Sequence, residues 1–145
     1  MSFSFPMTIS YKVLKVINKT TVSGKKTDNI RSILQNTLDE TTSELSFDLG
    51  SKTSEVYKTK KANCVGYTVF FNNLLVKKLK EKNIGNIQIS HVRAKVHYLN
   101  MNLHVINSKS LKDHDISVVK NLTTGETYYV DASLSEVLGQ LIIKQ

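Results

Sequence analysis

The spacing of apolar residues changes along the chain from every second position to every third or fourth, which predicts a mixture of strands and helices. From Thr8 to Val22, β-branched residues alternate with polar ones, which predicts a strand. Apolar residues then recur at helical spacing, which predicts a helix capped by Thr27 or Asp28 and reaching about Leu45. The residues from Ser46 to Lys61 are mostly polar and predict a connecting loop.

The middle of the chain carries the strongest helical pattern. Apolar residues recur every three or four positions behind Asn63, a natural N-cap, and Asn83-Ile84-Gly85 ends the pattern. Strict alternation from Ile87 to Tyr98 then predicts a strand. The segment from Asn100 to Asp113 has no clear period, and we interpret it as a loop with room for one helical turn.

Two short β-rich runs follow and predict a hairpin. They are Asp115 to Lys120 and Thr127 to Asp131, on either side of the turn Leu122-Thr-Thr-Gly125. Behind them, Ser133-Leu-Ser-Glu136 reads as a capping box, which predicts a helix over residues 134–145.

Length, composition and charge narrow the class of protein. The chain has 145 residues and a net charge of +8, which suits one domain with a basic surface. Nucleic acid is not a favoured partner, because the chain has only two arginines, no zinc-finger spacing and no RNP-like aromatic pattern. The start of the sequence does not resemble a signal peptide, and no apolar run has the length of a membrane span, so we expect a soluble, cytoplasmic protein.

The single cysteine is the first candidate for chemistry. One cysteine forms no internal disulfide and no cysteine-rich zinc site, so Cys64 is either a packing residue or a reactive thiol. Its predicted position is the first turn of the strongest helix, where free backbone N–H groups and the helix dipole stabilise a thiolate. Lys60 and Lys61 lie just upstream and act in the same direction.

A thiol nucleophile needs a base, and the base needs a group that orients it. If the hairpin closes with Asn121 opposite Glu126, then His114 and Asp131 lie on one face as diagonal neighbours, roughly 7–8 Å apart at the backbone and within side-chain reach. A slip of one residue would separate them. Asp115 follows His114 directly on the strand and so faces away from it.

The other histidines are weaker candidates. His91 and His97 share a strand face but lie about 20 Å apart, which is too far to bind one metal. His104 is the one rival for the base, but it has no following strand and no carboxylate partner. We therefore expect neither a metal nor a cofactor.

The segments around these residues resemble the transglutaminase-like superfamily. Lys58 to Leu75 is similar to the helix that carries its nucleophile, and Asp113 to Ser133 is similar to its histidine strand, turn and aspartate strand. Two positions depart from the family pattern, because Asp115 follows the histidine and Ala132 replaces the usual proline. The similarity covers a little over half of the chain, about 58–133.

The resemblance implies a papain-like α+β core, in which a helix bearing the nucleophile packs on an antiparallel sheet. Residues 1–57 would then add an N-terminal strand and helix to the catalytic core of 58–133. The implied triad is Cys64, His114 and Asp131, and the implied chemistry is acyl transfer on peptide or glutamine amides of a protein or peptide substrate. The Cys64 backbone N–H would be one oxyanion donor, with Tyr57 as a candidate for the second.

Other functions stay open at this point. Protease, deamidase and cross-linking transferase share this triad and differ in what resolves the thioester. A binding module without turnover, whose basic surface contacts an acidic protein or nucleic acid, is the main alternative to an enzyme. A toxin or effector that acts on another organism's protein is a third.

Overall fold

The computed structural model describes residues 8–99, 114–138 and 142–145. Its helices are α1 (Arg31–Glu44), α2 (Val56–Thr59), α3 (Cys64–Glu81) and α5 (Ala132–Leu138), with a 3-10 turn η1 (Thr53–Glu55). Its strands are β1 (Thr8–Val22), β2 (Ser46–Phe47), β3 (Lys61–Ala62), β4 (Ile87–Leu99), β5 (His114–Asn121), β6 (Thr127–Val130) and β7 (Ile142–Lys144). No helix within these ranges is long and apolar enough to span a membrane.

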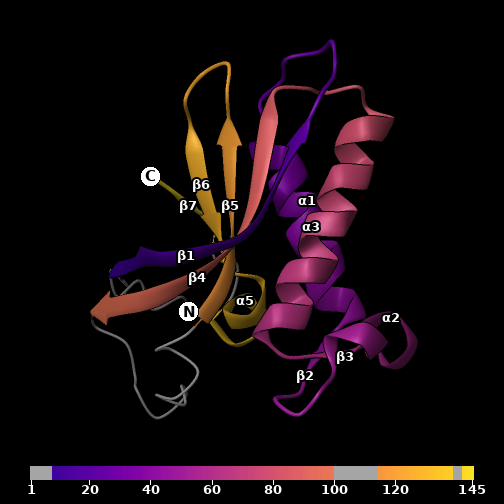
Figure 1. Ribbon diagram of the computed structural model, residues 1–145, viewed down its shortest axis with the longest axis vertical. Coiled ribbons are helices and arrows are strands. Elements are labelled where there is room, and N and C mark those ends of the chain that lie inside the picture. Colours follow the sequence, from indigo (N-terminus) through magenta and orange to yellow (C-terminus); the bar gives the residue numbers. More distant parts are fainter. Residues whose placement is uncertain (1–7, 100–113, 139–141) are drawn as a thin grey trace, which may run out of the picture.

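The fold is a mixed α+β arrangement built on an antiparallel sheet. Five strands pair in the order β1-β4-β5-β6-β7, and the short strands β2 and β3 form a separate parallel pair. Helices α1 and α3 lie together on one side of the sheet, and α5 lies at the end of the sheet where β5 begins (Figure 1). The start of α3 lies at that same end.

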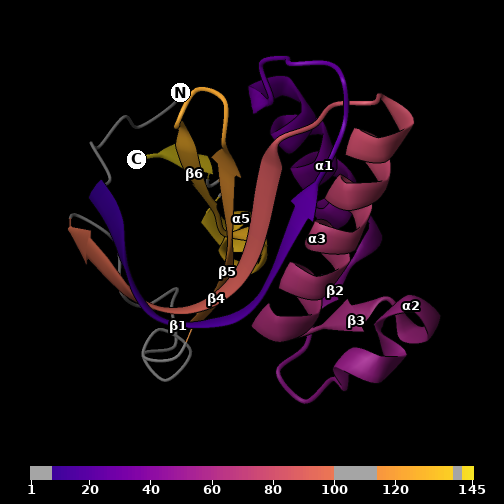
Figure 2. The ribbon, with the colours of Figure 1, turned by 45° about the horizontal axis from the view of Figure 1, so that its top comes forward.

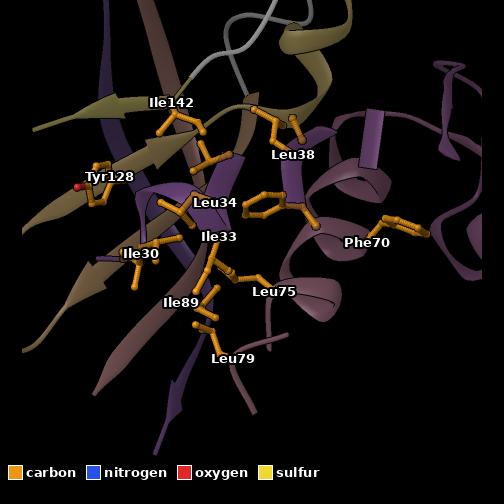
Figure 3. Close-up of a cluster of buried hydrophobic side chains, with 14 of the residues drawn as sticks. Ile30, Ile33, Leu34, Leu38, Phe70, Leu75, Leu79, Ile89, Tyr128 and Ile142 are labelled. Atoms are coloured by element: carbon orange, nitrogen blue, oxygen red, sulfur yellow. The ribbon is translucent and has the colours of Figure 1, made fainter. Parts of the chain in front are cut away.

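The main core fills the space between the two long helices and the sheet (Figure 3). Leu34, Leu38 and Leu75 from the helices are fully buried there against β-branched residues of the strands, such as Ile89. A second apolar cluster lies on the other face of the sheet and includes Tyr11, Val92, Ala94, Ile116 and Leu134. Successive residues of β5 therefore alternate between two buried environments.

Strands β1 and β4 are long and strongly curved (Figure 2). They pair along their whole length, with irregularities between Val13 and Lys15 and between Val16 and Asn18. Extra residues of this kind bend a strand and increase its twist. The curvature brings the first half of β1 over the second apolar cluster, where Tyr11 packs.

The predicted hairpin register is confirmed. The backbone N–H of Asn121 donates to Glu126 O at 2.8 Å, and Lys120 pairs with Thr127, so residues 122–125 form the four-residue loop. Gly125 adopts a positive φ of 80°, which glycine does without strain. The strand from Thr8, the Asn63 cap of α3 and the strand from Ile87 also lie where the sequence pattern predicts them.

Two predicted details of the N-terminal half are wrong. The N-cap of α1 is neither Thr27 nor Asp28 but Ile30, which has no side-chain capping bond. Just before it, Asn29 Oδ1 accepts the backbone N–H of Arg31 at 2.9 Å. The segment from Ser46 to Lys61 is not a plain loop either, because it contains β2, η1 and α2. Elements this short leave no periodic pattern in the sequence, because their stability comes from tertiary contacts.

The prediction of one helix over residues 134–145 is also wrong. The helix begins at Ala132, and Ile142–Lys144 forms β7, which pairs with β6. The isoleucines of β7 are β-branched, which favours a strand at this edge of the sheet. Ile142 is part of the main core. The predicted loop of 100–113 lies outside the described residues.

Two turns touch backbone to backbone at Gly24 and Gly85, where a Cβ on Gly85 would collide with the main chain of Gly24. We predict that Gly85→Ala lowers the free energy of unfolding by about 1–3 kcal/mol, because backbone has to move. The matched control is Gly50→Ala, whose Cβ would meet only a side-chain atom of Asp48 at 3.7 Å. Urea unfolding measures both, and equal stabilities of the two variants would contradict this packing.

Candidate active site

Hydrogen bonds of two side chains, Asn63 and Thr68, hold the start of α3 in place. Asn63 Oδ1 accepts the backbone N–H of Gly66 at 3.1 Å, and its Nδ2 donates to Ser51 O at 3.3 Å. Thr68 Oγ1 lies 2.8 Å from the carbonyl oxygen of Cys64 and 3.1 Å from that of Asp115, which ties the first turn to β5. Cys64 therefore lies at a helix N-terminus that these bonds hold in place, and the residue is only half-buried.

His114 is the first residue of β5 and is 2% exposed. Its Nε2 lies 2.7 Å from Oδ1 and 2.8 Å from Oδ2 of Asp131, so one ring nitrogen faces both carboxylate oxygens. The contact between these two side chains, predicted from the register of the hairpin, is present. Their position at the sheet end shared with α3 places them next to the helix that carries Cys64.

Asp131 is fully buried, directly after β6. Its Oδ1 accepts the backbone N–H of Leu134 at 3.2 Å and lies 3.4 Å from Ser133 Oγ, so Asp131, and not Ser133, caps α5. Its Oδ2 accepts the phenolic hydroxyl of Tyr11 at 2.7 Å. The carboxylate thus joins three elements of the fold to the histidine.

The Cys64 sulfur acts on the same ring. Burial by itself would lower the pKa of His114, but the charge and hydrogen bond of Asp131, followed by the interaction with Cys64, raise that pKa to about 10. Nε2 contacts Asp131, whereas Nδ1 is buried and has no hydrogen-bond partner among the described residues, so Nδ1 is the ring nitrogen open to a further partner. With a pKa of about 10, the ring is protonated at neutral pH.

A second histidine–aspartate pair lies on the opposite face of β5. His91 Nε2 is 2.6 Å from Asp115 Oδ2, and Arg93 Nε is 3.3 Å from Oδ1. Burial would raise the pKa of Asp115, but its bonds to His91 and Arg93 hold that pKa below the usual value. Asp115 therefore faces away from His114, as its position on the strand predicts. Its partners were not predicted, although His91 and Arg93 share a face of one strand.

Tyr57 is not placed to donate to an oxyanion beside Cys64. Its hydroxyl accepts the side-chain amide of Asn73 at 3.0 Å, and its ring packs on Phe70. Asn73 lies nine residues beyond Cys64 on α3, roughly 13 Å along the helix axis. Lys60 also points elsewhere, because its Nζ pairs with Glu44 at 3.7 Å.

The remaining expectations concern other histidines and metals. His104, the rival base, lies outside the described residues. Within the described ranges, no group of three or more His, Cys, Asp or Glu side chains is arranged to hold a metal ion. No protein-family model, no curated protein and no solved structure matches the chain, so the site is described by its own geometry.

The raised pKa of His114 makes the stability of the folded protein depend on pH. Because folding raises its pKa from 6.5 to about 10, the stability that it contributes is fully present below about pH 6.5 and is lost as pH rises through about 10. We predict that the difference in unfolding free energy between wild type and His114→Gln shrinks across this window, by up to about 1.4 kcal/mol per pH unit.

Urea unfolding at several pH values measures this difference. The control is His97→Gln, which removes an exposed histidine of β4 and is measured over the same range. A difference for His114→Gln that stays constant with pH would contradict the raised pKa of the ring.

Proposed function

We propose that the protein is a cysteine-dependent acyl-transfer enzyme with a transglutaminase-like, papain-related core, acting on peptide or glutamine amides. The observation that carries the proposal is the bond between His114 and Asp131, together with the effect of Cys64 on the pKa of the same ring. Sulfur, imidazole and carboxylate come from α3, β5 and the end of β6, and the imidazole has one nitrogen on the carboxylate and one without a partner among the described residues. This is the arrangement that activates a thiol nucleophile.

The surroundings of Cys64 support its role as the nucleophile. His114, whose pKa Cys64 helps to raise, is protonated at neutral pH. The first turn of an eighteen-residue helix adds its free N–H groups and the positive end of its dipole. Cys64 is half-buried, so the residue is partly open to its surroundings.

In the proposed reaction, the Cys64 thiolate attacks the carbonyl carbon of the amide and forms a tetrahedral oxyanion. His114 then donates its Nδ1 proton to the leaving nitrogen, the C–N bond breaks, and an acyl-thioester remains on the sulfur. In the second half, His114 takes a proton from water or from an amine as that group attacks the thioester. The thiolate and the imidazolium are regenerated, so protons and charge balance.

The surrounding residues have distinct parts in this scheme. The backbone N–H of Cys64 lies at the first position of the helix and has no carbonyl partner within the helix, so it is available to the oxyanion. Asp131 holds Nε2 and stabilises the imidazolium. Cys64 is half-buried and His114 is buried, so water is kept from the ring.

The proposal predicts an unusually reactive thiol. Because Cys64 is the only cysteine, intact mass after treatment with iodoacetamide measures its alkylation alone. At about pH 6 an ordinary thiol is almost fully protonated, so we expect wild type to react at least about tenfold faster than His114→Ala. His97→Ala, at an exposed position, should react like wild type.

Equal alkylation rates in wild type and His114→Ala would contradict the ion pair and favour the alternative of a binding module with a basic surface. If the ion pair is present, the products identify the reaction class. With a glutamine peptide and a primary amine, ammonia release with amine incorporation indicates a transferase, ammonia release alone a deamidase, and new peptide termini a protease.

A further inference from the structure

One buried polar group next to the site has no part in the proposed reaction. The hydroxyl of Tyr11 donates to Asp131 Oδ2 at 2.7 Å, across 120 residues of sequence. Asp131 is fully buried and Tyr11 is 9% exposed, so water does not replace this bond. A hydrogen bond to a buried charge is among the strongest in proteins, and it changes how much charge the carboxylate presents to its other partners.

Tyr11 reaches Asp131 because of the curvature of the sheet. β1 is separated from β6 by β4 and β5 in the strand order. Strands β1 and β4 bend strongly along their length (Figure 2). The Tyr11 ring packs against Tyr129 of β6, with ring centroids 5.8 Å apart. The ring is thus held by the second apolar cluster, and the hydroxyl is aimed at the carboxylate.

The bonds to the carboxylate are divided between its two oxygens. Oδ1 has the backbone N–H of Leu134 and the Ser133 hydroxyl, both from α5. Oδ2 has the Tyr11 hydroxyl, and His114 Nε2 lies 2.7 and 2.8 Å from Oδ1 and Oδ2. Without Tyr11, Oδ2 would keep His114 as its one hydrogen-bond partner among the described residues. The imidazolium would then face a more concentrated negative charge.

We propose that Tyr11 is a positioning residue of the site, whose hydroxyl fixes the Asp131 carboxylate against Nε2 of His114 and moderates the charge that it presents to the ring. The inference rests on the proposed function for its role in catalysis. Burial and the neighbouring Asp131 raise the pKa of Tyr11, so the hydroxyl keeps its proton and remains a donor.

The charged neighbours of the ring are few, which makes the effect measurable. From the end of β6 and from α3, Asp131 and Cys64 are the ionisable groups that shift the pKa of His114. From β1, Tyr11 acts through Asp131. On β4, the residue paired with His114 is Ala94, and on β5 the adjacent Asp115 bonds to His91 on the other face.

The test is an NMR titration of the His114 ring in protein labelled with ¹⁵N-histidine, in which His114→Gln identifies the signal. We expect Tyr11→Phe to raise the titration midpoint by about one pH unit, because the loss of the donor strengthens the attraction between Asp131 and the imidazolium. The matched control is Tyr129→Phe. It removes a hydroxyl from the ring that packs on Tyr11, and that hydroxyl has no hydrogen bond to the described residues.

An unchanged or lowered midpoint in Tyr11→Phe, or an equal rise in Tyr129→Phe, would overturn the inference. If Tyr11→Phe does not fold, Tyr11→Phe combined with Asp131→Asn decides the matter. Recovery of folding means that the hydroxyl serves the carboxylate, and failure to recover overturns it. Alkylation of Cys64 in wild type reports on the proposed function separately, since it does not depend on Tyr11.

Discussion

The buried carboxylate of Asp131 is bonded to three separate elements of the fold. It accepts hydrogen bonds from a strand 120 residues away in sequence, from the first turn of the helix that it caps, and from the ring of His114. A buried anion with these partners is stabilised, whereas the same anion with one partner removed is costly. The carboxylate therefore constrains β1, β5 and α5 together, and it fixes the ring that faces Cys64.

Local chemistry was enough to predict part of this arrangement. The four-residue turn after Asn121 determined the hairpin register, and the register placed His114 beside Asp131. Asn63 predicted the start of α3, because a side-chain cap is visible in sequence. These features depend on residues a few positions apart, or on strands joined by one short turn.

The features that escaped prediction depend on distant parts of the chain. Nothing near Tyr11 in sequence indicates a carboxylate partner, because Asp131 lies 120 residues away and β4 and β5 stand between β1 and β6 in the sheet. Asp131 was expected to orient a histidine, and it also caps α5, which the better-known pattern of Ser133 and Glu136 obscured. The strand at Ile142 forms because β6 offers an edge, which is a property of the assembled sheet.

Strand β5 contributes one residue to each of two histidine–aspartate pairs, and the two pairs lie in different surroundings. The pair of His91 and Asp115 includes Arg93 and lies on the face covered by the long helices. The pair of His114 and Asp131 lies at the sheet end where α3 begins, and Cys64 contributes to the raised pKa of His114. Proximity to the helix N-terminus, and not the presence of a histidine–aspartate pair, distinguishes the candidate active site.

In the proposed mechanism, the Cys64 sulfur is ionised beside the protonated His114 ring. The most direct test is the ultraviolet thiolate absorbance of the protein at about pH 6, taken as the difference from Cys64→Ala. We expect a thiolate band in the wild-type protein that disappears in His114→Ala. Absence of the band in the wild-type protein, with absorbance appearing only in the range of an unperturbed thiol, would contradict it.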